Sequence, residues 1–373
     1  MKRNSTGDEM KATTFPELLA EASQRGRLTV GCDLGDRTTK ICVLDAEGEV
    51  CARQTIRTRP DNVREWFERC PKARVVIEVG THSRWFDELL RTMGHESIVA
   101  NPRQLPLIYR NRSKTDELDA ERLARIGRVD LKLLCPIQHR SQGAQADLAV
   151  IRARDVVVRE RTRLVNHIRG VVKPFGYRLP GCSAEGFSDR IRDDLPRSLW
   201  PAVGPLLAIL RQIDRQIAQF DKRIAERAKT AYPEVARMTQ VHGVGVLTAL
   251  ALTLVVEDRG RFKKSRDIGP FLGLVPRKSQ TGESDPELGI SKAGDELVRR
   301  LLVQCAHHIL GRFGPDSDLR RYGLRVAGQG GQNAKKRAVV AVARKLVVLL
   351  HRLWVTGAAY QPIGHQAIAR KAA

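Results

Sequence analysis

Four acidic residues have the types and the spacing that metal-dependent chemistry requires. Asp33 closes a short β-branched run that starts at Leu28, and Glu78 closes the later run Arg-Val-Val-Ile-Glu. Asp116 and Asp119 follow in Lys-Thr-Asp-Glu-Leu-Asp-Ala, where the i, i+3 spacing places both side chains on one face of a helix. Each acid alone could simply cap a turn or a helix. Together they predict a group of carboxylates at one edge of a sheet.

Four convergent carboxylates cannot all stay ionised in a partly dry cleft without cations. A set of four oxygen donors suits Mg²⁺, and Mn²⁺ as a second choice. Two such ions about 3.5–4 Å apart can clamp the entering and leaving oxygens of a phosphodiester displacement. We therefore expect Asp33, Glu78, Asp116 and Asp119 to be catalytic acids and metal ligands.

Short strands and helices must position these acids. Runs rich in β-branched residues predict strands at 28–33, 40–44, 50–55, 74–78 and 96–100, and apolar spacing predicts helices at 61–70 and 85–93. Tight turns join the first three strands, and helices separate the later ones. This order is typical of a mixed α/β sheet that begins with an antiparallel meander. Strands that enter the sheet in the same direction would bring Asp33 and Glu78 together.

The pattern becomes helical from residue 141 onward. Apolar residues recur at helical spacing up to Gly170, and a second run advances in steps of four and three residues: Leu206, Leu210, Ile213, Ile217, Phe220 and Ile224. This heptad pattern predicts a helical hairpin or coiled coil, paired within the chain or with another protomer.

Two glycines, Gly243 and Gly245, stand in an hGhG pattern over residues 241–249. The pattern predicts a helix-hairpin-helix turn whose backbone N–H groups face a phosphate. The alternative is a glycine-rich cap between two ordinary helices.

The composition carries a large positive excess. Lys and Arg number 65 against 42 Asp and Glu, which gives a net charge of +23 and favours a polyanionic partner. Aromatic residues make up 5% of the chain, which argues against single-strand binding by stacking and for contact with a phosphate backbone. Residues 299–373 hold 14 Lys and Arg against two Asp. The candidate phosphate contacts are Lys114, Arg299, Arg300, Lys335, Lys336 and Arg337.

The cysteines and the apolar runs bear on location. Seven cysteines without a CxxC pair argue against a disulfide framework or a zinc site and indicate a reducing cytoplasm. No run of about 18 apolar residues predicts a membrane span, and residues 1–20 lack the apolar core of a secretory signal. We expect a cytoplasmic protein, nucleoid-associated when bound, without membrane contact.

The first phosphate loop of the actin and sugar-kinase ATPases offers a rival interpretation of residues 33–40, which also follow one strand and precede another. That fold needs a second phosphate loop and an adenosine-contacting Gly-Gly, and neither stands at a suitable position. A charge of +23 is also unusual for a small-metabolite kinase.

Five features occur in an order that identifies a known family. They are Cys-Asp33, Ile-Glu78, the segment Lys-Thr-Asp116-Glu-Leu-Asp119-Ala, the hGhG turn, and the later block Phe271-Leu-Gly-Leu-Val-Pro-Arg277…Gly282…Gly289-Ile-Ser-Lys-Ala-Gly-Asp295. From about Leu28 to Trp354 the sequence resembles the DEDD transposases of the one-hundred-ten family of bacterial insertion sequences, kin of the Piv invertase.

The resemblance implies an α/β plus all-α architecture. Its parts are an N-terminal RuvC-like, ribonuclease-H-type domain with the acid tetrad, a coiled-coil linker and a helical C-terminal transposase domain. It also implies double-stranded DNA as substrate, both element ends and target, a bridge RNA as guide, and a homo-oligomer, dimer or tetramer. The resemblance further implies a mechanism in which a serine of the C-terminal domain becomes covalently joined to DNA. The acid tetrad of a partner subunit completes the active site in that mechanism.

One position departs from the family pattern. The family has a serine directly before Gly282, where this chain has Thr281. A threonine hydroxyl can attack phosphorus, although its methyl group crowds the approach and restricts χ1. Three possibilities stay open: Thr281 is the nucleophile, nearby Ser279 or Ser284 replaces it, or this copy is inactive.

We expect five segments along the chain: an N-terminal extension at 1–26, the RuvC-like domain at 27–140, a helical region at 141–235, the transposase domain at 236–355 and a basic tail at 356–373. Three functions remain in play at this point. They are a transposase or recombinase, a RuvC-like endonuclease or junction resolvase that hydrolyses with water, and a non-catalytic nucleic-acid-binding relative of transposases.

Overall fold

The computed structural model describes residues 14–101, 116–277 and 288–363, and the chain divides into two compact units, Met1–His139 and Arg140–Ala373. Each unit contains its own hydrophobic core. Lys114 and Thr281 lie outside the described residues, as do Ser279 and Ser284.

A five-stranded sheet forms the centre of the first unit. Its elements in chain order are α1 (Phe15–Gln24), β1 (Thr29–Leu34), β2 (Thr38–Leu44), β3 (Val50–Arg57), α2 (Pro60–Glu68), β4 (Arg74–Glu78), α3 (Ser83–Thr92), β5 (Glu96–Ala100) and α5 (Asp116–Val129), followed by the short 3₁₀ helix Leu131–Leu134. The strand order is β3-β2-β1-β4-β5. The first three strands are antiparallel, and β1, β4 and β5 are parallel. The predicted mixed α/β sheet with an initial meander is confirmed.

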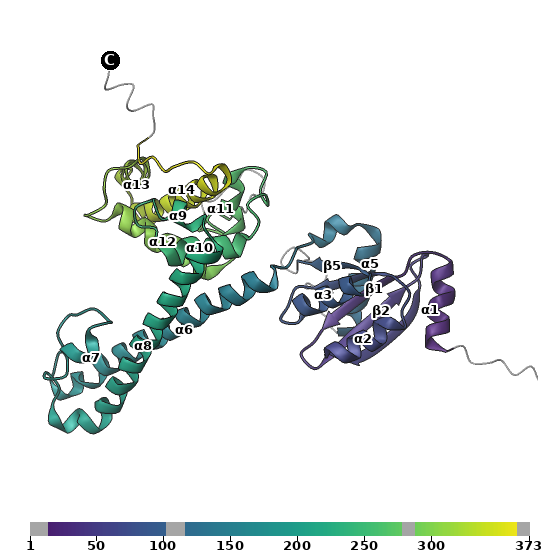
Figure 1. Cartoon of the computed structure of the whole chain (residues 1–373), viewed down its shortest axis with the longest axis horizontal. Helices are drawn as coiled ribbons and strands as arrows, with labels where there is room; N and C mark the ends of the chain where they lie inside the picture. Colours follow the sequence, from purple (N-terminus) through teal and green to yellow (C-terminus); the bar gives the residue numbers. More distant parts are fainter. Residues whose placement is uncertain (1–13, 102–115, 278–287, 364–373) are drawn as a thin grey trace, which may run out of the picture. The chain divides into compact units, whose positions relative to one another are not determined.

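Helices cover both faces of this sheet (Figure 1). Val30 and Cys32 of β1 point into the larger core, where Phe67 of α2 and Phe86 of α3 are fully buried. Because side chains alternate along a strand, Gly31 and Asp33 point to the opposite face. That face is covered by α5, whose Ala120 and Ala124 pack with residues of β2.

The backbone of α5 lies directly on β1. A Cβ atom added to Gly31 would stand 2.0 Å from the carbonyl oxygen of Ala120 and 2.6 Å from the amide nitrogen of Ala124. Gly127, near the end of α5, lies against the side chain of Val76 in β4, 2.3 Å from where an added Cβ would stand. Glycine is therefore required at residue 31 because the helix backbone occupies the space of any larger side chain.

The second unit is helical. Its elements are α6 (Gln142–Val171), α7 (Phe187–Arg190), α8 (Trp200–Ala231), α9 (Val235–Met238), α10 (Val246–Val256), α11 (Ile268–Phe271), α12 (Glu296–Leu310), α13 (Asp318–Gly328) and α14 (Ala334–Thr356), with 3₁₀ helices at Lys173–Phe175, Arg197–Leu199 and Ser265–Asp267. Every residue of α10 from Thr248 to Val256 is buried, so this helix forms the centre of the C-terminal bundle. None of the helices that the structure describes is both long and apolar enough to cross a membrane.

The long helices α6 and α8 form an antiparallel pair. Ion pairs join Asp147 to Arg227, Arg154 to Asp221 and Arg161 to Asp214, so positions advance along one helix as they recede along the other. The predicted seam lies on the inner side of α8, where Leu210, Ile217 and Ile224 are buried and Leu206, Ile213 and Phe220 are half-buried. The pair forms within one chain.

Replacing Gly31 by Ala tests the contact between α5 and β1. The new methyl group would overlap the helix backbone, and overpacking of this kind costs about 1–3 kcal/mol. We expect urea unfolding of the full chain to show this loss, whereas Gly80→Ala should change stability by less than about 0.5 kcal/mol because no atom lies within 4 Å of its added Cβ. Equal stability of the two variants would contradict the proposed role of Gly31.

Candidate catalytic and nucleic-acid-binding site

Asp33 and Glu78 lie side by side at the carboxyl ends of two neighbouring parallel strands. The last residues paired between β1 and β4 are Cys32 and Ile77, and each acid is the next residue in its strand. Neighbouring strands are about 4.8 Å apart, and equal positions in register point to the same face. For both acids that face is the one covered by α5, since Gly31 and Val76 also contact this helix.

The first turn of α5 brings the other two acids to the same place. Arg74, at the start of β4, donates a 3.0 Å hydrogen bond from Nη1 to the carbonyl of Gly127, near the end of α5. The helix therefore runs against the direction of β4, and its first turn lies at the carboxyl ends of the strands. Asp116 is exposed there, whereas Asp119 is only 6% exposed. All four predicted acids thus share one end and one face of the sheet.

Cations accompany the acids of α5. Lys40, which is paired with Asp33 across β1 and β2, places Nζ 3.3 Å from Oε1 of Glu117. Arg122 places Nη1 3.2 Å from Oδ1 of the buried Asp119. These cations offset part of the repulsion between the carboxylates. The sequence pattern did not single out Lys40 or Arg122, although Arg122 stands three residues after Asp119 on the same helix.

The donor set suits a hard divalent cation, because all four groups are carboxylates. Their arrangement is nevertheless open. Within the described ranges, no three His, Cys, Asp or Glu side chains are gathered closely enough to hold a metal ion. The structure therefore places the four acids at one end and on one face of the sheet, but does not gather them into a coordination sphere.

A histidine that sequence reasoning missed stands at the same end of the sheet. The indole nitrogen Nε1 of Trp85 donates to Nδ1 of His82 at 3.1 Å, and Nε2 of His82 lies 3.3 Å from Oδ1 of Asp36. Because Nδ1 accepts a hydrogen bond, the proton of the neutral ring must be on Nε2, which donates to Asp36. Asp36 follows β1 and His82 follows β4, and no sequence spacing relates them.

The two glycines of the hGhG pattern have different surroundings. Gly243 has φ +83°, and an added Cβ would lie 3.2 Å from the carbonyl oxygen of Cys305 in α12. Its lack of a side chain therefore serves a tight turn and the packing of α12. Gly245 precedes α10 as its N-cap residue and has no atom within 4 Å of an added Cβ. Phosphate binding by these glycines stays a prediction.

Some of the predicted phosphate contacts are bonded to other protein groups, and others are exposed. Arg299 donates from Nη1 to the carbonyls of Leu272 and Ala293, and Arg300 is paired with Asp155. Both guanidinium groups hold parts of the protein together, so their contact with phosphate stays a prediction. Lys335, Lys336 and Arg337 are exposed at the start of α14.

The chain on both sides of segment 278–287, which contains Thr281, is held together. Pro276 and Ile290 form an antiparallel bridge, and the amide of Arg277 donates to the carbonyl of Gly289 at 3.1 Å. Farther along the bridge, the amide of Ser291 donates to the carbonyl of Val275 at 2.8 Å. The residues directly before and after the segment are therefore held next to each other by this bridge.

Two family models match this chain. Residues 30–175 match the model of DEDD transposases of the IS110 type, and residues 235–322 match the model described as "Transposase IS116/IS110/IS902 family". The first range contains the four acids, and the second contains the hGhG turn and Thr281.

Similar proteins carry related descriptions. The transposase for insertion sequence element IS1328 of Yersinia enterocolitica is 29% identical over 325 residues, which cover 85% of this chain and 93% of that protein. The transposase for insertion sequence element IS1111A of Coxiella burnetii is 27% identical over 333 residues, 85% of this chain and 86% of that protein. A pilin gene-inverting protein of Moraxella lacunata is 26% identical over 141 residues, 38% of this chain and 41% of that protein.

The first matched range thus contains the sheet with its four acids and continues through α6, and the second lies within the helical unit and includes the bridge between Pro276 and Ile290. The chain belongs to the IS116/IS110/IS902 family of insertion-sequence transposases and is a DNA transposase.

Proposed function

We propose that this transposase cuts and rejoins DNA with a metal-binding acid tetrad, Asp33, Glu78, Asp116 and Asp119, and with the hydroxyl of Thr281 as nucleophile. The observation that supports the tetrad most directly is that all four acids share the carboxyl end and the α5 face of the sheet. Thr281 is assigned by its place before Gly282, which matches the family serine.

The four carboxylates would hold Mg²⁺, or Mn²⁺ in its place. When bound, the metal would polarise the scissile phosphate and stabilise the leaving 3′ oxygen. The hydroxyl oxygen of Thr281 attacks phosphorus in line and forms an ester with the 5′ phosphate as the bond to the 3′ oxygen breaks. The proton that the threonine hydroxyl loses passes through solvent to the leaving 3′ oxygen, which becomes a 3′ hydroxyl. The ester conserves the bond for rejoining, because a 3′ hydroxyl can later displace the threonine oxygen.

The finer architecture is part of this proposal. The first unit is RuvC-like, the pair of α6 and α8 acts as a coiled-coil linker, and the turn at residues 241–249 acts as a helix-hairpin-helix element. The chain keeps the five segments expected from the sequence. The residues that bind double-stranded DNA are Lys114, Gly243, Gly245, Arg299 and Arg300 of α12, and Lys335, Lys336 and Arg337 at the start of α14. A guiding bridge RNA, a dimer or tetramer and a cytoplasmic location complete the proposal and rest on the resemblance and the composition.

Replacing Asp33 by Asn tests the tetrad. The substitution keeps the shape of the side chain but removes the charge that a divalent ion needs. We expect Mg²⁺-dependent cleavage of labelled element-end DNA to fall by at least about 10²-fold, the effect of losing a single electrostatic stabiliser. DNA binding should stay within twofold of the parent.

The matched control is Glu65→Gln, which removes one exposed carboxylate from α2. Its cleavage rate should equal that of the parent. Full cleavage by the Asp33 variant would show that this residue is not a metal ligand.

Replacing Thr281 by Ala and by Ser tests the nucleophile. We expect the Ala variant to form no covalent protein–DNA adduct, because it lacks the attacking oxygen. The Ser variant should form the adduct at least as fast as the parent, since it keeps the hydroxyl and loses the crowding methyl group. The measurement is a denaturing gel of a labelled DNA strand after reaction.

Adduct formation by the Ala variant would exclude Thr281 as nucleophile. Strand cleavage by the parent without any adduct would instead indicate hydrolysis by water, the chemistry of the resolvase alternative. An inactive parent that still binds DNA would indicate the non-catalytic alternative.

A further inference from the structure

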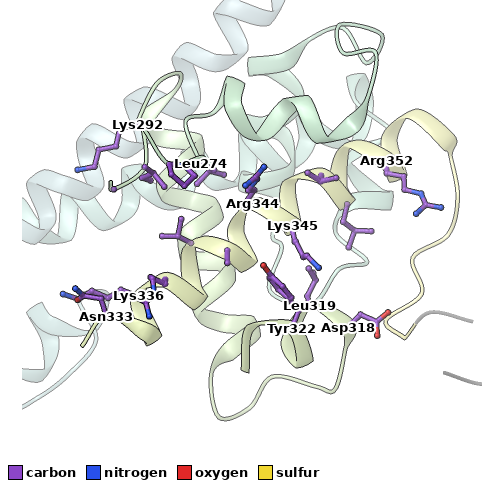
Figure 2. A pocket seen from close by; sticks show the side chains of 18 of the residues that line it. Leu274, Lys292, Asp318, Leu319, Tyr322, Asn333, Lys336, Arg344, Lys345 and Arg352 are labelled. Atoms are coloured by element: carbon purple, nitrogen blue, oxygen red, sulfur yellow. The ribbon is translucent and has the colours of Figure 1, made fainter. Parts of the chain in front are cut away.

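A groove of about 1200 Å³ lies along the outer side of α14, and its lining comes from five stretches of the second unit. We define the α14 groove by its described lining residues in 274–276, 288–292, 318–322, 333–352 and 360–362. Figure 2 shows Lys336, Arg344, Lys345 and Arg352 along α14, with Leu319 and Tyr322 beside Lys345. A cavity of this size exceeds the usual range of about 300–1,000 Å³ for small-molecule sites.

The rim of the α14 groove is strongly positive. Six cationic residues contribute to the lining: Lys292, Lys336, Arg337, Arg344, Lys345 and Arg352. Asp318 is the one acid among the lining residues that the structure describes. Arg337 and Arg344 are seven residues apart, as are Lys345 and Arg352, so each pair follows one side of the helix with a spacing of about 10.5 Å.

The pairing of these cations differs from that of six arginines elsewhere in the unit. Each of these six forms an ion pair with an aspartate: Arg152, Arg154, Arg161, Arg227, Arg300 and Arg321. Among the described residues, none of the six groove cations forms an ion pair with a carboxylate. Arg337 donates to the carbonyl of Gly330, and Lys345 lies 3.7 Å from the ring centre of Tyr322. An excess of unpaired cations is the pattern of a surface that contacts phosphates.

The floor of the α14 groove is apolar. Val340, Ala341, Val348 and Leu349 are half-buried on the outer side of α14, where a solvated helix would carry polar residues. A DNA duplex presents phosphates outward and keeps its base faces stacked inside, so it gains little from a hydrocarbon floor. An unpaired strand offers both phosphates for the rim and base faces for the floor.

The α14 groove adjoins the anchored ends of the segment with Thr281. Its lining includes Pro276 and Ile290, which form the bridge, and Leu288 directly after the segment. A strand bound in the groove would therefore lie next to the start and the end of the segment that carries the proposed nucleophile. This neighbourhood favours the DNA strand that is cut over an RNA strand.

We propose that the α14 groove binds an unpaired, single-stranded stretch of the DNA substrate beside the cleavage point. The proposal deepens the proposed function and rests on it for the identity of the strand. It also changes the expectation from composition, because hydrocarbon side chains here take the place that aromatic stacking platforms have in other single-strand binders.

The experiment measures binding of three labelled oligonucleotides to the full chain in EDTA, which prevents cleavage. The probes are a single DNA strand, the duplex of the same sequence and the matching RNA strand. We expect the double variant Arg344→Gln/Arg352→Gln to bind the single DNA strand at least tenfold more weakly and the duplex within twofold of the parent. The salt dependence of single-strand binding should fall by about 0.7 per charge removed.

Two further variants separate the groove from general charge effects. Val348→Gln removes hydrocarbon without changing charge, so we expect a severalfold loss of single-strand affinity with an unchanged salt dependence. The control Arg312→Gln/Arg325→Gln removes two exposed cations outside the groove and should bind the single strand within twofold of the parent. Thermal unfolding of each variant checks that the bundle stays folded.

Three results would overturn the proposal: an equal loss for strand and duplex, a loss for the RNA strand alone, or no loss. Failure of the proposed chemistry is distinguishable, because Asp33→Asn should still bind the single strand in EDTA. If that variant cleaves DNA fully while the groove variants bind the single strand weakly, the proposal for the α14 groove stands and the assignment of the tetrad as metal ligands is wrong.

Discussion

The placement of the acids depends on one backbone contact, the approach of α5 to β1 at Gly31. With no Cβ between them, the carbonyl of Ala120 and the amide of Ala124 come against the strand. Near the other end of the helix, Gly127 leaves room for the side chain of Val76 in β4, and the hydrogen bond from Arg74 fixes the direction of the helix. The first turn of α5 is thereby held at the carboxyl ends of β1 and β4. The four acids share one end and one face of the sheet because the backbones of α5 and β1 lie in contact.

Repulsion between neighbouring carboxylates destabilises the first unit, and nearby cations offset part of it. Asp119 is nearly buried and lies beside Arg122, while Lys40 extends from β2 to Glu117. Farther along α5, hydrogen bonds from Arg125 and Arg53 lower the pKa of Glu121 below its ordinary value. Cations from the helix and from the neighbouring strands thus accompany its acids, which lets an acid-rich helix pack on a sheet.

Local patterns predicted the five strands, α2, α3 and the pair of α6 and α8, because β-branched runs and heptad spacing record local preferences. They missed α1, which lies within the segment expected to be an N-terminal extension. The meeting of Asp33 and Glu78 was also predictable, since it needs only two parallel strands. The approach of α5 at Gly31 was not, because it joins residues about 90 positions apart. Charge alone suggested Arg300 as a phosphate contact, but its partner Asp155 is 145 residues away in sequence. The α14 groove combines five separate stretches of the chain, so no window of sequence contains it.

Net charge therefore overstates the surface that is free to bind phosphate. Of the 14 cations in residues 299–373, Arg299 and Arg320 donate to backbone carbonyls, and Arg300 and Arg321 pair with aspartates. The same residue type thus serves two purposes, holding the helices of the bundle together and presenting charge outward. The outward set gathers on α14, where an apolar strip separates the cations. An apolar strip gains no contact from a partner that offers only phosphates. The arrangement of charged and apolar residues on the basic surface, rather than its total charge, therefore indicates what it binds.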